Sequence, residues 1–152
     1  MLEGASDDAY RPGTKPHGTV LCPGCKAVFR KGRWIWAAAP AGALKRRCPA
    51  CLRIAQGSPA GYITLGGSFF TEHRAEVLAR VRHCEEKEKT THPLERIMAI
   101  EAAKTGVLVT TTSVHLARRV AHALESAFKG SLNLSYNHQD NLLRVRWSRA
   151  AD

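Results

Sequence analysis

Two cysteine pairs, each in a Cys-Pro-x-Cys sequence, are the residues of this chain whose types and spacing could do chemistry. A gap of 22 residues separates the first pair, Cys22 and Cys25, from the second, Cys48 and Cys51. Each Cys-x-x-Cys segment can turn both thiolates to one side of a tight loop, and two such loops supply a tetrahedral set of four sulfurs. Zinc prefers this geometry and these soft ligands, and iron or an iron–sulfur cluster is the alternative. The sequence predicts one structural zinc ion bound by Cys22, Cys25, Cys48 and Cys51.

Redox chemistry is the other use of a Cys-Pro-x-Cys pair, as in thioredoxin-type motifs. A redox pair of that type usually sits where a strand gives way to a helix, and one pair suffices. Residues 19–57 show no helical pattern, so we expect neither pair to open a helix. Because sulfur fills all four positions, no ligand site stays open for catalysis. The fifth cysteine, Cys84, is expected to be a small apolar residue near the buried face of a helix.

Positive charge is concentrated around the cysteine pairs. The chain has a formal net charge of +10, and its first 60 residues hold 10 Lys and Arg against 3 Asp and Glu. Such a concentration favours polyanions such as RNA or DNA, although a basic surface can also serve solubility alone. The basic residues predicted to contact RNA are Arg30, Lys31, Arg33, Lys45, Arg46, Arg47 and Arg53. Trp34 and Trp36 lie among them and could stack on unpaired bases, but both face the same way, which favours packing as the core of a small zinc module for both.

The chain divides into three segments that must position these residues. Residues 1–18 have no hydrophobic periodicity and predict a flexible tail. Residues 19–57 predict a zinc ribbon in which AVFRKGRWIWA forms a hairpin, with Lys31 and Gly32 near its turn. A segment of about 40 residues without a large hydrophobic core needs an additional source of stability, and a bound zinc ion supplies it. Residues 60–149 predict an α/β domain, so the expected fold class is α+β.

The α/β domain is predicted to have the order β-α-α-β-α-β-β. A strand at 61–65 precedes a helix through TEHRAEVLARVRH, and a second helix is predicted from Pro93, with Leu94, Ile97 and Met98 on one face. A strand at 107–112, a helix capped by Ser113 and a final hairpin follow. Helices that cross between strands favour parallel pairing. The predicted core includes Tyr62, Leu78, Ile97, Leu108, Val120, Leu124, Leu134 and Val145.

The segments CPACLRI, AGYITL and GVLVTTTSVHLARRVAHALESAFKGSLNLSYN together resemble a known family. They are similar to the archaeal and eukaryotic export adaptors of the large ribosomal subunit, the nonsense-mediated decay protein three family, in a short bacterial-type form. The resemblance covers residues 22–149. It implies zinc on the four cysteines and binding to rRNA or to the ribosome, with the large subunit as the expected partner. Nuclear export is not implied, because the family's additional cysteine pairs and export signals have no counterpart here.

Other function classes are less well supported by the sequence. There is no Gly-rich phosphate loop, nucleophile elbow or plausible carboxylate pair, so an enzyme is not expected. No apolar run reaches the roughly 20 residues of a membrane helix, and residues 1–20 do not read as a signal peptide, so a cytoplasmic protein is expected. The sequence predicts a zinc-ribbon RNA-binding protein associated with the ribosome, acting in assembly, hibernation or quality control. The alternative is a protein-interaction adaptor whose ribbon docks on an acidic protein partner.

Overall fold

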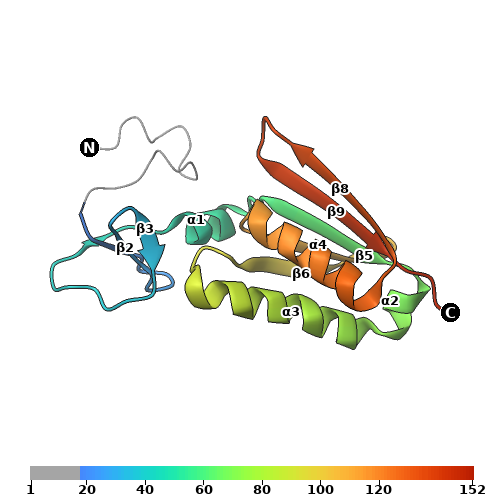
Figure 1. Cartoon of the computed structure of the whole chain (residues 1–152). Helices are drawn as coiled ribbons and strands as arrows, with labels where there is room; N and C mark the ends of the chain where they lie inside the picture. Colours follow the sequence, from blue (N-terminus) through green and yellow to red (C-terminus); the bar gives the residue numbers. More distant parts are fainter. Residues whose placement is uncertain (1–17) are drawn as a thin grey trace.

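The computed structural model describes residues 18–152, which form two β-sheets and four helices. The mixed α+β fold class is therefore confirmed. In Figure 1 the small sheet lies at the left, and a short helix leads from it to the larger sheet at the right. The predicted flexible tail, residues 1–18, falls outside the described residues except for Gly18.

The small sheet is built from four short strands in the order β3-β2-β1-β4. The strands are β1 (Val20–Leu21), β2 (Val28–Arg30), β3 (Arg33–Ile35) and β4 (Leu44–Lys45). β2 and β3 form an antiparallel hairpin whose two-residue turn is Lys31 and Gly32, with φ angles of 51° and 84°. Two positive φ angles in succession match the right-handed twist of the flanking strands, and glycine adopts such angles without strain. The predicted hairpin and its turn are confirmed.

Helix α1 (Pro49–Gln56) begins at the second cysteine pair, so the expectation that residues 19–57 contain no helix was wrong. Cys48 is the N-cap, and its side chain accepts a hydrogen bond from the backbone amide of Cys51. Pro49 occupies the first helical position, where a missing N–H breaks no helical hydrogen bond. Gly57 ends the helix with a φ of 62°. Eight residues are too few to show a helical period, which is why the pattern was not visible.

The larger sheet has five strands in the order β6-β7-β5-β9-β8. They are β5 (Gly61–Gly66), β6 (Ile97–Ala103), β7 (Gly106–Thr111), β8 (Ser131–Asn137) and β9 (Leu142–Ser148). β5 pairs antiparallel with β7 and parallel with β9, and the β6–β7 and β8–β9 pairs are antiparallel. Within this sheet, parallel pairing is therefore confined to β5 and β9.

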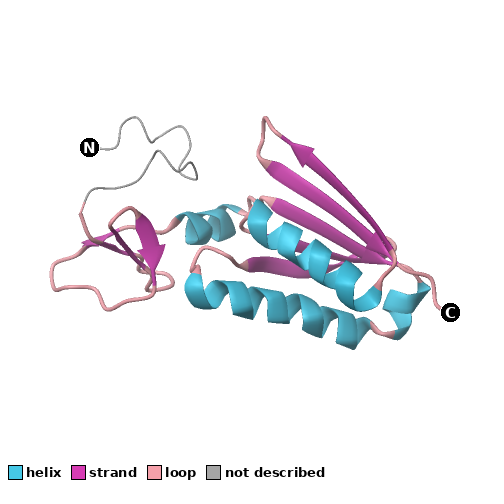
Figure 2. Cartoon of the chain, viewed as in Figure 1, coloured by secondary structure: helices cyan, strands magenta, loops and turns pink. Residues whose placement is uncertain are grey.

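The other three helices are α2 (Ser68–Glu72), α3 (Arg74–Thr91) and α4 (Val114–Phe128). Figures 1 and 2 show α3 and α4 side by side on one face of the larger sheet. α4 is capped as predicted, because the Ser113 hydroxyl accepts a hydrogen bond of 2.9 Å from the amide of Leu116. Its predicted buried stripe is also confirmed, since Leu116, Val120, Leu124 and Phe128 all belong to the core.

The predicted helix from Pro93 was wrong, because residues 97–103 form strand β6. The second part of the chain therefore has the order β-α-α-β-β-α-β-β. The register of β6 against β7 shifts between Ile97 and Ala99, which marks a bulge. A bulge puts one extra residue into a strand, so Ile97 and Ile100 come to one face although they are three positions apart. That spacing imitates a helix. β6 turns directly into β7 and pairs antiparallel with it, and β7 also pairs antiparallel with β5. The parallel pairing expected between β5 and β7 was therefore wrong.

The predicted core is only partly correct. Val120, Leu124 and Val145 are at most 1% exposed, and Leu78, Ile97 and Leu134 pack against the core while partly exposed. Tyr62 and Leu108 are half-buried and lie on the opposite face of the sheet from the core. Successive side chains of a strand point to opposite faces of the sheet, and only one face packs on the helices. The residues that β5 and β7 turn toward the helices are Ile63, Leu65, Val107 and Val109.

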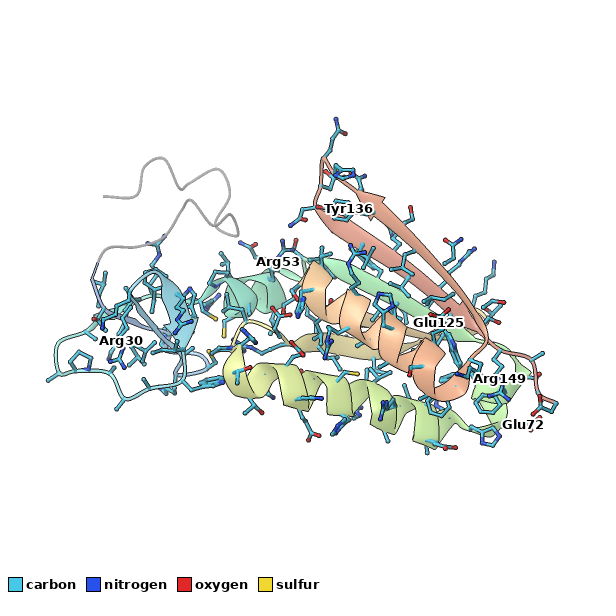
Figure 3. The ribbon with its side chains drawn as sticks, in the orientation of Figure 1. Arg30, Arg53, Glu72, Glu125, Tyr136 and Arg149 are labelled. Carbon is cyan, nitrogen blue, oxygen red and sulfur yellow. The ribbon has the colours of Figure 1, made fainter. Side chains whose placement is uncertain are left out.

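Truncation of Leu124 to alanine tests this core, because the Leu124 side chain is fully buried beneath α4. The variant should lose about 2–5 kcal/mol of the free energy of unfolding, measured by urea denaturation. Glu125→Ala changes the exposed neighbour on the same helix, labelled in Figure 3, and should stay within about 0.5 kcal/mol of the parent. Equal stabilities for the two variants would contradict the burial of this face.

Candidate metal centre

The sulfur atoms of Cys22, Cys25, Cys48 and Cys51 lie within 4.8 Å of one another. The distance between the Sγ atoms of Cys25 and Cys48 is 3.8 Å. A regular tetrahedron with metal–sulfur bonds of about 2.3 Å has sulfur–sulfur edges of about 3.8 Å. The four predicted ligands are therefore brought together, and they could hold one metal ion.

The first cysteine pair is shaped by a tight backbone turn between β1 and β2. The amide of Cys22 donates to the carbonyl of Ala27, and the amide of Lys26 donates back to the carbonyl of Cys22, both at 2.9 Å. Gly24, between the two cysteines, leaves room for the second pair, because a Cβ atom there would lie only 3.0 Å from the Sγ of Cys51. The turn thus points the sulfurs of Cys22 and Cys25 toward the second pair, and glycine at position 24 avoids a clash with Cys51.

The second cysteine pair is held by the start of α1. The amide of Cys51 donates to the Sγ of Cys48 at 3.3 Å, and the amide of Cys48 donates to the Sγ of Cys22 at 3.2 Å. Backbone amides at a helix N-terminus carry partial positive charge, which stabilises thiolates. The start of a helix is also where a redox pair would sit, contrary to our expectation for this chain. The convergence of both pairs on one point is the feature that a metal site needs and a single redox pair does not.

Burial and mutual repulsion control the charge of these thiols. Burial raises the pKa of the Cys22 thiol, but hydrogen bonds from backbone amides, that of Cys48 foremost, stabilise its thiolate and bring the pKa down to about 6. Burial raises the pKa of Cys48 and of Cys25, and the negative charge of Cys22 opposes their ionisation as well. Four thiolates at this spacing therefore need a cation among them, which is what a bound metal ion supplies.

Arg96 is the residue at this site that the sequence analysis missed. Its guanidinium donates from Nη2 to the Sγ of Cys48 at 3.2 Å and from Nη1 to the Sγ of Cys51 at 3.4 Å. Its Nε donates to the carbonyl of Pro93 at 2.9 Å, which fixes the plane of the group. Arg96 precedes β6, so the larger sheet contributes directly to the cysteine site. No motif marks it, because it lies 45 residues from the nearest cysteine ligand along the chain.

Two further contacts join the ribbon to the rest of the chain. The indole N–H of Trp36 donates to the carbonyl of Lys89, near the end of α3, at 2.7 Å. Leu94 packs against the cysteine cluster together with Trp34, whose ring also lies 5.4 Å from that of Phe29. Trp36 is 42% exposed, so the expected core role holds for Trp34 and not for Trp36. The cysteine site thus lies at the junction between the ribbon and the larger sheet.

The basic residues predicted from the sequence fall into two groups. Arg46 and Arg53 are half-buried: the Nη1 atom of Arg46 is buried, and the Nη1 atom of Arg53 donates to the carbonyl of Ser58 at 2.9 Å beside the end of α1. Figure 3 labels Arg53 on α1 and Arg30 on the ribbon. The remaining five are exposed on the ribbon, namely Arg30, Lys31, Arg33, Lys45 and Arg47.

The exposed basic residues lie along two parts of the small sheet. Arg30, Lys31 and Arg33 belong to the β2–β3 hairpin, and β4 with its neighbouring residues contributes the other two. β1 lies between β2 and β4, so those strands are about 10 Å apart. A single polyanion chain can therefore contact both groups of basic residues.

No protein-family model and no curated protein matches this chain. Within residues 18–152, no helix is long and apolar enough to cross a membrane. Function must therefore be inferred from the chemistry of the site.

Replacement of Arg96 by glutamine tests its role at the cysteine site. Arg96→Gln should lower the affinity for the bound metal ion about 10–100-fold, because groups that hydrogen-bond to metal ligands typically contribute that much. The measurement is competition between the protein and a chromophoric chelator. Arg96→Lys should be intermediate, since an ammonium cannot present the planar fork that reaches both sulfurs.

A charge-matched control for this measurement is Arg82→Gln, which changes an exposed arginine on α3. It should bind the metal as the parent does. If Arg96→Gln were folded and competed with the chelator equally well, the hydrogen bonds to sulfur would contribute nothing to metal binding.

Proposed function

We propose that this protein is a zinc-ribbon RNA-binding protein that associates with the ribosome. Zinc is the metal ion that this site favours. Four cysteine thiolates in a tetrahedral arrangement favour zinc over oxygen-loving cations such as magnesium or calcium. Short strands and a small buried cluster give the ribbon little core of its own, so a structural metal ion suits it energetically.

The observation that carries the RNA proposal is the charge of the ribbon. Residues 18–57 contain eight Lys and Arg and no Asp or Glu. Among residues 18–152, no ion pair joins an acidic side chain to any of the five exposed basic residues of the ribbon. Unpaired cations on a surface attract polyanions, and binding releases the counterions of the phosphate backbone. A phosphate backbone is the partner that this charge pattern fits best.

The ribbon also holds these cations in place. The hairpin turn and the first cysteine turn fix the backbone on either side of β2, and Arg47 directly precedes the ligand Cys48. A rigid backbone loses less entropy when its side chains bind. The choice of ribosomal RNA, and of the large subunit in particular, depends on the resemblance to the export-adaptor family. Assembly, hibernation and quality control are the roles compatible with such binding.

A second candidate function is an adaptor that docks on an acidic protein. Leu44 and Ile54 are 60% and 42% exposed on the same ribbon and its helix α1. Exposed aliphatic side chains beside positive charge suit a protein surface better than a phosphate backbone. The salt dependence of binding distinguishes the two candidates, because counterion release gives nucleic acid a steeper fall with salt.

The metal proposal predicts one zinc ion per chain. Cys48→Ser with Cys51→Ser should abolish zinc binding, since two of four ligands are lost, and should unfold the ribbon while the helices of the larger domain remain. Elemental analysis gives the metal content, and circular dichroism gives the helical content. Cys84→Ser is the matched control, because Cys84 lies outside the cluster, and it should retain full zinc. Full zinc in the double variant would contradict the proposal.

The RNA proposal predicts that charge on the ribbon controls ribosome and RNA association. The triple variant Arg30→Gln, Arg33→Gln and Arg47→Gln should weaken binding at least tenfold and make the logarithmic salt slope shallower by up to about three units. Arg46 stays unchanged, because part of its guanidinium is buried. Co-sedimentation with ribosomal subunits across a salt series measures both quantities.

A variant with the same loss of charge elsewhere serves as the control for this series. Arg80→Gln, Arg82→Gln and Arg118→Gln change exposed arginines of α3 and α4 and should leave binding within about twofold of the parent. If the two triple variants weakened binding equally, the net charge of the protein would account for RNA binding, and the ribbon would not be the binding surface. If neither did so and the salt slope were flat, the adaptor function would replace the RNA proposal.

A further inference from the structure

Within residues 18–152, one face of the larger sheet carries the helices and the other does not. The core residues of the central strands point toward α3 and α4, which lie on the same side in Figures 1 and 2. Side chains alternate along a strand, so the intervening residues point the other way. On the three central strands these outward residues include Tyr62, Thr64, Leu108, Thr110, Arg144 and Arg146, and we call this group of six the open face. None of the six is fully buried.

An aromatic ring and two arginines lie together on the open face. Tyr62 is directly opposite Arg144 in the pairing of β5 with β9, and the guanidinium carbon of Arg144 lies 4.7 Å from the centroid of the tyrosine ring. Arg146 is next along the same face of β9, about 7 Å away, opposite Thr64. Both arginines are exposed. Within residues 18–152, neither forms an ion pair with an acidic side chain.

Charge on the open face is distributed unevenly across the strands. The outward residues of β8 are neutral and polar, and those opposite the arginines of β9 are Asn133 and Ser135. Glu101 is the outward acidic residue of this sheet, and it lies on β6, separated from β5 by β7. A polyanion is therefore favoured over β5, β9 and β8 and disfavoured over β6.

We propose that the open face binds single-stranded RNA, with one base stacked on Tyr62 and the backbone phosphates held by Arg144 and Arg146. A base stacks on an aromatic ring only when it is unpaired, and a flat sheet cannot enter the deep, narrow major groove of an RNA duplex. The surrounding threonine, serine and asparagine side chains can donate to base edges or to the 2′-hydroxyl. The large aliphatic side chains that these three strands turn to this face are Leu108 and, at the start of β9, Leu142, so a protein partner would find little apolar area to bury.

The position of Tyr62 connects this face to the ribbon. Only residues 57–60 separate α1 from β5, so Tyr62 lies at the end of the sheet nearest the ribbon. The open face therefore begins within a few residues of the ribbon along the chain. The inference rests on the proposed RNA-binding function and specifies its substrate as unpaired RNA.

The experiment uses the full chain and a fluorescent RNA of about 12 nucleotides, as a single strand and as a blunt duplex. Tyr62→Leu keeps an apolar side chain but removes the ring, and it should weaken single-strand binding about tenfold. Tyr62→Phe keeps the ring and should bind as the parent does. Arg144→Gln with Arg146→Gln should weaken binding and make the salt slope shallower by about two units. Duplex binding, measured by the same fluorescence anisotropy, should not respond to Tyr62→Leu.

The control Arg80→Gln with Arg82→Gln removes the same charge from α3 and should bind as the parent does. If the parent binds RNA but Tyr62→Leu and the Arg144/Arg146 variant bind equally well, the open face is not a binding surface, while the ribbon proposal stands. Equal weakening of single-strand and duplex binding by Tyr62→Leu would also overturn it, because stacking cannot then be the cause. A parent that binds neither RNA overturns both proposals. Urea denaturation confirms that each variant is folded.

Discussion

The arrangement of this chain depends on bringing four cysteine sulfurs to one point without leaving their charge uncompensated. A divalent cation bound by four thiolates still carries a formal charge of about −2, and the surrounding protein must stabilise it. The N-terminus of α1 supplies amide hydrogen bonds from within the ribbon. Arg96 supplies a full positive charge from outside the ribbon, through hydrogen bonds to two sulfurs. The hydrogen bonds of Arg96 therefore stabilise the cysteine site and also attach the ribbon to the part of the chain that forms the larger sheet.

This attachment explains how a ribbon with no acidic side chain can fold. Eight cations among residues 18–57 repel one another, and strands of two or three residues bury little apolar area against that repulsion. The cysteine site provides a compact negative centre within the same segment. Trp36 and Leu94 add contacts across the junction that do not depend on charge. Positive charge can then remain on the outer surface, where a polyanionic partner is able to neutralise it.

The sequence predicted the features that depend on local chemistry. Cysteine spacing predicted the four-sulfur cluster, Lys31-Gly32 predicted the hairpin turn, and Ser113 predicted the start of α4. The features it missed depend on contacts that no local pattern encodes. The bulge in β6 gave a strand the spacing of a helix, and Arg96 reaches the cysteines only through the tertiary fold. Tyr62 was assigned to the core because alternation along a strand does not reveal which face the helices cover.

The direction of β7 decides whether the larger sheet has an open face. In a parallel α/β sheet the crossover helices cover both faces. Here β5 and β6 run parallel with β7 between them, and β7 and β8 run parallel with β5 and β9 between them. The two crossovers start from antiparallel strands and move in opposite directions across the sheet, so the right-handed rule places α3 and α4 on the same side. The strand that the sequence analysis mistook for a helix is thus the element that reverses β7. It also leaves Tyr62, Arg144 and Arg146 facing solvent rather than packed beneath a helix.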